Sequence, residues 1–98
     1  KASRKADREQ AAGERQARLA ARRPLVKERE QLERKLGGWQ SEKKLLDERL
    51  ADPALYAGGD SALLQQLLRR QAELSGEIDS AELRWLEIEE QLEALAVD

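Results

Sequence analysis

A seven-residue repeat of large apolar residues runs along the last third of the chain. Its positions alternate steps of three and four residues, and they are Leu64, Leu67, Gln71, Leu74, Ile78, Ala81, Trp85, Ile88, Leu92 and Leu95. The residues between them are mostly Gln, Glu, Asp, Arg and Ser. A helix with such a seam is stable only when the seam is buried against another helix, and seven residues is the period of a coiled coil. The pattern predicts one half of a coiled coil over residues 61–96.

A second repeat with the same spacing supplies the partner and predicts a helix over residues 25–51. Its positions are Leu25, Arg29, Leu32, Leu36, Trp39, Lys43, Leu46 and Leu50. Gly37 and Gly38 interrupt this helix at outward-facing positions, where each costs about 1 kcal/mol relative to Ala. Ala, Leu, Glu, Lys and Arg together make up 64 of the 98 residues, which is typical of a coiled coil or long helix.

The connection between the two repeats, residues 52–60, carries strong turn signals. Asp52 followed by Pro53 predicts the start of one short helical turn, because Asp caps helix N-termini and Pro fits their first position. The Gly58-Gly59 pair permits a chain reversal, and Asp60 or Ser61 can cap the final helix. Two apolar residues also lie in this tip, and we expect Leu55 and Tyr56 to fold back over the end of the seam.

A connection this short forces the two helices into an antiparallel hairpin. The expected fold is therefore all-α: a two-helix antiparallel coiled-coil hairpin with a short helical turn at the tip. Two registers are open, one with Leu32 beside Trp85 and one with Leu25 beside Trp85. We favour the first, because it leaves the shorter loop and pairs large Leu36 with small Ala81. The isolated hairpin is expected to be a monomer, with weak self-association as the alternative.

Residues 1–23 form a basic arm with a single large apolar residue, Leu19. Without a seam this arm cannot be buried, so it is either a solvated helix or a partly disordered linker from an upstream domain. Pro24 predicts a helix start or a kink at the junction with the hairpin of residues 24–98. Residues 1–24 hold eight Lys and Arg against three Asp and Glu, whereas residues 61–98 hold three against nine.

The residue types present argue against catalysis. The chain has no His and no Cys, so nucleophile–base pairs and zinc sites built on them are excluded. The Gly58-Gly59-Asp60-Ser61 stretch lacks the Lys and the spacing of a phosphate-binding loop. The carboxylates lie on solvated helix faces. We expect no catalytic residue, metal or cofactor in this chain.

No apolar run approaches the ~18 residues of a membrane-spanning helix, and a cytoplasmic location fits the lack of cysteine best.

Basic residues are the only candidates for a binding site. In either register one group lies near the tip, and it comprises Lys43, Lys44, Arg49, Arg69 and Arg70. A second group lies in the arm and includes Arg15, Arg18, Arg22 and Arg23. These residues are either solvated charges that pair with Glu of the other helix, or a surface that contacts phosphates.

Three polar residues occupy positions within the seam: Arg29, Lys43 and Gln71. In one interpretation their aliphatic stems cover apolar surface while their polar ends reach water and nearby Glu. In the other interpretation they fix the register and orientation of the helices at some cost in stability.

Four stretches of the chain resemble a known family. They are the basic Ala- and Arg-rich arm, the RPLVKEREQLE stretch at 23–33, the LADPALY stretch at 50–56, and a final helix with Trp85-Leu86-Glu87 and Glu90-Gln91-Leu92-Glu93. Together they are similar to the C-terminal coiled-coil domain of ABC-F ATPases, in particular the YheS branch, with Uup as a more distant relative.

This resemblance implies a cytoplasmic bacterial protein with two ATP-binding cassettes upstream, which would use ATP and Mg, and with no membrane domain. In that family the cassettes act on ribosomes, and C-terminal coiled coils are associated with nucleic-acid binding. Our leading hypothesis is an accessory hairpin that contacts RNA, the ribosome or DNA through its basic residues. The alternative is a structural or docking arm that packs on its own ATPase domains or on another protein.

Overall fold

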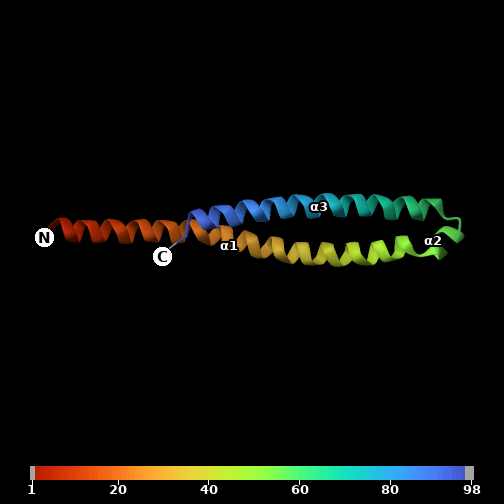
Figure 1. Cartoon of the computed structure of the whole chain (residues 1–98), viewed down its shortest axis with the longest axis horizontal. Helices are drawn as coiled ribbons and strands as arrows, with labels where there is room; N and C mark the ends of the chain where they lie inside the picture. The colour runs from red at the N-terminus through yellow and green to blue at the C-terminus, as the bar shows by residue number, and fades with distance from the viewer. Residues whose placement is uncertain (1, 97–98) are drawn as a thin grey trace.

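The computed structural model describes residues 2–96, with side chains from residue 3, and shows a long helical hairpin (Figure 1). Its elements are α1 (Ala2–Ala51), α2 (Pro53–Ala57) and α3 (Ser61–Ala94). The molecule is a rod of 84 × 14 × 14 Å in which α3 packs antiparallel to the second half of α1. The expected all-α antiparallel hairpin is confirmed. Neither long helix of the described part contains a segment apolar enough to cross a membrane.

The basic arm is helical, and α1 does not begin at Pro24 but continues through it. A proline inside a helix removes one hydrogen bond to the carbonyl four residues earlier. Here that carbonyl belongs to Ala20, which lies on the exposed part of the arm, so water can replace the missing donor. Of the two alternatives at Pro24, the helix start was wrong for this reason, and the kink stays a prediction. Of the two alternatives for the arm, the solvated helix is the one observed.

The buried residues all lie at the seam positions of the two repeats. They are Leu46, Leu50, Leu74, Ile78, Ala81, Ile88 and Leu92. Leu74 and Ile88 have no solvent-exposed surface, and burying a side chain of this size contributes roughly 1.5–3 kcal/mol. The core is thus a single line of side chains between two helices, with the most completely buried residues on α3.

Three contacts between α1 and α3 establish the register. Gln71 Nε2 donates to Asp47 Oδ1 at 2.9 Å, and Trp85 Nε1 donates to Glu33 Oε1 at 3.1 Å. Arg29 Nη1 donates to Glu89 Oε1 at 2.6 Å. All three agree with the register that places Leu32 beside Trp85. A slip to the other register, by seven residues, would move each partner away by about 10 Å along the axis, so the favoured register is confirmed.

The caps at the tip follow the turn signals of the sequence. Asp52 Oδ1 accepts a hydrogen bond from the Ala54 N–H at 3.0 Å, with Pro53 as the first residue of α2. Gly59 has a φ of 71°, a left-handed conformation that favours glycine. Asp60 Oδ1 accepts from the Leu63 N–H at 3.0 Å and caps α3. These interactions define the start of α2 and of α3 at the expected residues.

The two apolar tip residues behave differently from each other. Leu55 is half-buried and packs against the cluster formed by Leu46, Leu50 and Leu74. Tyr56 remains 55% exposed, and its hydroxyl donates to the Leu50 carbonyl at 2.6 Å. The expectation that both would cover the seam was therefore right for Leu55 only. Tyr56 instead satisfies a carbonyl at the end of α1, where helices leave their last carbonyls unpaired.

Candidate nucleic-acid interface

Arg70, one of the expected basic residues of the tip, is neutralised by carboxylates. Its Nε and Nη2 donate to the two carboxylate oxygens of Glu42 at 2.6 and 2.9 Å, and its Nη1 donates to Glu73 at 3.2 Å. The hydrogen bonds from Arg70 hold the pKa of the Glu42 carboxyl below its ordinary value. Arg70 is therefore a clamp between the helices, which favours the alternative of pairing with Glu of the other helix, and its role in phosphate binding stays a prediction.

Lys43 belongs to a second polar contact and is also paired. Its Nζ lies 2.7 Å from Asp47 Oδ2, and the other oxygen of Asp47 accepts from Gln71. The hydrogen bond from Lys43, together with the one from Gln71, lowers the pKa of Asp47. Two of the three polar seam residues thus meet at one carboxylate, while the third, Arg29, pairs with Glu89. Their polar ends lie at the edge of the seam, as the first interpretation of these residues expected.

Three candidate cations of the tip remain exposed: Lys44, Arg49 and Arg69. None of them forms an ion pair with another side chain of the described residues. However, Lys44 and Arg49 occupy different faces of α1, at b and g positions of the repeat, and Arg69 lies on the outer f face of α3. The structure does not gather these three cations into one patch, because their positions in the repeat direct them to different sides of the hairpin.

A second clamp, which sequence reasoning missed, repeats the first one along the hairpin. Arg84 Nε and Nη2 donate to the two carboxylate oxygens of Glu28 at 2.6 and 2.8 Å, and Nη1 donates to Glu87 at 3.2 Å. The hydrogen bonds from Arg84 lower the pKa of Glu28. Both clamps share an Arg-x-x-Glu motif on α3 and lie on the same flank of the seam. That shared motif, read together with the register, was the signal that could have revealed them.

The arm extends beyond the end of α3 as a single helix (Figure 1). At the junction, Arg22 Nη1 donates to the Leu92 carbonyl at 2.8 Å. The Leu92 carbonyl also accepts from the Leu95 N–H at 3.2 Å, so Arg22 adds a second donor there and places a positive charge at the negative end of the helix dipole. Arg22 therefore has a structural role in addition to the expected one in the basic arm.

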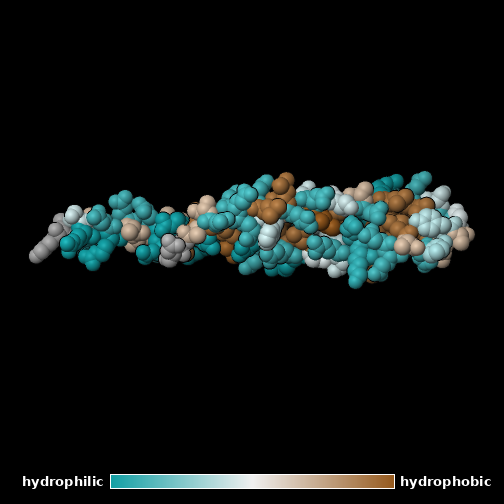
Figure 2. Space-filling view, in the orientation of Figure 1, coloured by the Kyte–Doolittle hydropathy of each residue, from teal (hydrophilic) through white to brown (hydrophobic). Residues whose placement is uncertain are grey.

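The remaining candidate cations of the arm are Arg15, Arg18 and Arg23. Arg15 and Arg23 are exposed, and Arg18 is half-buried with an Nε that has no hydrogen-bond partner among the described residues. Figure 2 shows mostly hydrophilic residues along the arm, while the hydrophobic residues visible on this face gather over the hairpin. The arm is thus the part of the molecule where basic side chains are most available for a ligand.

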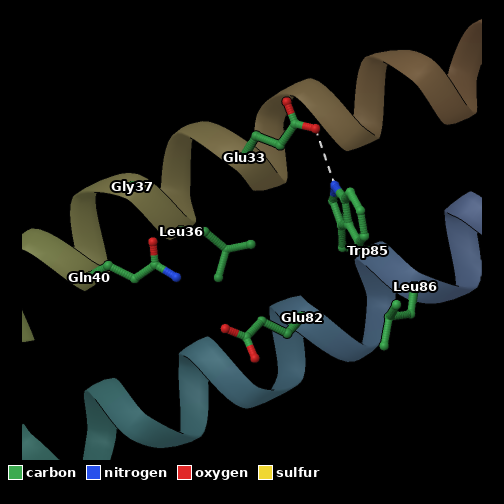
Figure 3. Close-up of a pocket in the computed structure, with 7 residues that line it drawn as sticks. All are labelled: Glu33, Leu36, Gly37, Gln40, Glu82, Trp85 and Leu86. Carbon is green, nitrogen blue, oxygen red and sulfur yellow. Dashed lines mark hydrogen bonds between the residues drawn. The ribbon is translucent and has the colours of Figure 1, made fainter.

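A shallow apolar groove lies on the flank of the hairpin opposite the two clamps (Figure 3). Leu36, Trp85 and Leu86 line it, and the indole N–H of Trp85 points across it to Glu33. Leu86 is 54% exposed. The groove offers apolar contact but no group suited to acid–base chemistry, and the described residues contain no cluster of ligands that could hold a metal ion.

Comparisons with known proteins place the hairpin in a family. The family model described as the ABC transporter C-terminal domain matches residues 21–90. The match covers the second part of α1, the tip and most of α3, and it leaves out most of the arm. Comparisons with curated proteins and with solved structures gave no match.

Proposed function

We propose that this chain, which belongs to the ABC transporter C-terminal domain family, contacts nucleic acid or the ribosome through the basic residues of its helical arm. Family membership makes the chain an accessory domain of an ABC protein. We further propose that the parent is a cytoplasmic ABC-F ATPase that binds ATP and Mg through cassettes outside this chain, and that the chain itself is not an enzyme. Purified alone, it should hydrolyse no ATP.

The observation that supports the proposal is the availability of the arm's cations. Among the described residues, the arm's Arg and Lys side chains up to Arg18 form no ion pair with a carboxylate, whereas Arg70 and Arg84 of the hairpin are each clamped by Glu. A cation without an internal partner can replace the counterions of a phosphate at little cost. The arm is also free of a packed neighbour, since α3 ends at Ala94.

The expected binding is weak, independent of sequence and steeply dependent on salt. Phosphate contacts through Lys and Arg carry no sequence information, because bases are distinguished by contacts to their edges or by stacking. The described residues offer no aromatic side chain on the arm. RNA and DNA of equal length and charge should therefore bind with similar dependence on salt concentration.

Two triple variants with equal loss of charge test the proposal. In the first, Arg15, Arg18 and Arg23 are replaced by Gln; in the second, Lys44, Arg49 and Arg69 are replaced by Gln. Arg22 is left unchanged because it caps α3. Each lost phosphate contact lowers the log–log salt slope by about 0.7–0.9, so the arm variant should lose about two units of slope and the tip variant clearly less. A parent that binds neither RNA nor DNA at low salt, or an arm variant that binds like the parent, would contradict the proposal.

The second candidate function is a docking arm that packs on the ATPase domains of the same protein or on a protein partner. The apolar groove with the exposed Leu86 favours it, since exposed apolar surface of this kind is often buried by a partner. Replacing Leu86 by Ser should then weaken association of the chain with separately produced ATP-binding domains. The matched control is Leu83→Ser, at a site of similar exposure outside the groove; equal effects of both would argue against docking at the groove.

A further inference from the structure

The three-and-four spacing of the hydrophobic seam continues into the arm, but there arginine takes the place of leucine. Counting back from Leu25 in the same steps reaches Arg22, Arg18, Arg15, Ala11, Arg8 and Arg4. Every position except Ala11 is Arg. Because α1 is one helix from Ala2 to Ala51, these residues lie on the face that carries the seam in the hairpin. We call this set of five arginines the arginine stripe.

The arginine stripe is narrow and long. At 3.6 residues per turn its members lie within about 80° of one another around the helix axis, and Arg4 and Arg22 are separated by about 27 Å along it. Neighbouring members are about 5–6 Å apart along the axis, except across Ala11. The acidic residues of the arm lie off the stripe: Asp7 and Glu14 follow one of its edges, and Glu9 lies farther round.

Apart from Arg22, which donates to the Leu92 carbonyl of α3, the side chains of the stripe have no helix to pack against. In the hairpin the same face is covered by α3, but α3 ends at Ala94, level with Arg22. Arg4, Arg8 and Arg15 are exposed, and Arg18 is half-buried. An apolar partner helix cannot take the place of α3 along the stripe, because it would bury several unpaired charges. A ligand for this face must bring a row of negative charges.

We propose that the arginine stripe binds a single row of phosphates along one strand of a nucleic acid, an inference that rests on the proposed function. Guanidinium groups pair well with phosphate oxygens, and a phosphodiester chain supplies one negative charge per nucleotide at regular intervals. The flanking acids Asp7 and Glu14 would face phosphates if the helix lay in a groove with a strand on each side. The stripe therefore fits the outside of a strand, with the acidic edge turned to solvent.

A variant that moves arginines to other faces of the arm, at constant net charge, separates the effect of their alignment from the effect of the arm's total charge. We call it the scattered variant. Three paired exchanges move positive charge off the face: Arg8→Ala with Ala6→Arg, Arg15→Ala with Ala12→Arg, and Arg18→Ala with Ala21→Arg. Ala and Arg have similar, high helix propensities, so the helix content measured by circular dichroism should match that of the parent. The probe is a 20-nucleotide single-stranded RNA, with the corresponding RNA duplex and a DNA duplex of the same length as separate arms.

The expected result is that the scattered variant loses about two units of log–log salt slope on every probe that the parent binds, since three aligned contacts are lost at about 0.7–0.9 each. The three probes then show whether the phosphate row is presented by a single strand or by a duplex. If the scattered variant binds like the parent, the stripe is wrong while the proposed contact through the arm's charge stands. If the parent binds no probe, both fail. Equal binding of the parent to poly-glutamate would overturn the stripe in favour of an acidic protein partner.

Discussion

Arg70 in α3 holds Glu42 in α1 with two parallel hydrogen bonds, of 2.6 and 2.9 Å. Its neighbour Arg69 has the same side chain but lies on the exposed outer face of α3 and forms no ion pair with the described residues. A single step along the helix thus separates an arginine that joins the two helices from one that is available to a ligand.

This difference predicts that two adjacent substitutions differ in their effect on stability. Arg70→Gln should lower the melting temperature by a few degrees at most, because a partly exposed ion pair contributes little. The loss should shrink as salt is added, since salt screens the pair in the parent. Arg69→Gln should leave the melting temperature unchanged. Thermal unfolding followed by circular dichroism at low and high salt checks both, and equal shifts for the two variants would contradict the clamp.

The two clamps also predict a dependence of stability on pH. Arg84 and Arg70 hold the pKa values of Glu28 and Glu42 below the ordinary value of 4.5. A carboxyl with a depressed pKa in the folded state adds stability above its unfolded pKa, and this contribution is lost as the pH falls through the folded value. The parent should therefore lose stability below about pH 4.5.

The matched control for this prediction is the double variant Glu28→Gln with Glu42→Gln. It removes both clamped carboxyls and leaves the other acidic residues in place, so its melting temperature should fall less than that of the parent between about pH 5 and pH 3. Parallel curves for parent and variant would show that the clamps do not contribute to the acid sensitivity of the hairpin.

The hairpin could be predicted from the sequence because its two seams share the same seven-residue period and a short connection joins them. The register followed from the small size of Ala81 and the length of the loop, and the contact between Trp85 and Glu33 agrees with it. The helical state of the arm could not be predicted in the same way. A solvated helix needs no pattern of buried residues. Pro24 is a strong signal for a helix break, but the exposed backbone tolerates the proline and the helix continues.

The pairing of the basic residues at the tip could not be predicted from their position along the hairpin alone, and their role in phosphate binding stays a prediction. Lys43, Lys44, Arg69 and Arg70 all lie near one level of the rod. Their directions around each helix decide whether they meet a carboxylate of the other helix or face solvent. The same reasoning, applied to α1 before Leu25, would have found the arginine stripe from the spacing alone.

The completely buried Leu74 predicts a large effect of a charge in the seam. Leu74 has no exposed surface and packs in the core cluster near the tip that also contains Leu46 and Leu50. Leu74→Asp removes these contacts and buries a carboxylate, which should cost about 2–4 kcal/mol. Because the core is a single line of side chains, the hairpin has little stability to lose, and the Leu74→Asp variant should melt near room temperature. Leu83→Asp, at a site that is 60% exposed, should unfold like the parent; similar losses for both would show that Leu74 is not in the core.

Gly37 and Gly59 predict opposite effects of the same substitution. A Cβ added at Gly37 would meet no atom within 4 Å, and the residue lies in the interior of α1. Gly37→Ala should therefore raise the free energy of unfolding by about 1 kcal/mol, because alanine has the higher helix propensity and restricts the unfolded chain. Gly59 also has open space around it, but its φ of +71° is unfavourable for a residue with a Cβ. Gly59→Ala should lower the free energy of unfolding by about 1 kcal/mol. Urea unfolding of the two variants checks the pair, and stabilisation by both would mean that the chain reversal at the tip does not need the left-handed conformation.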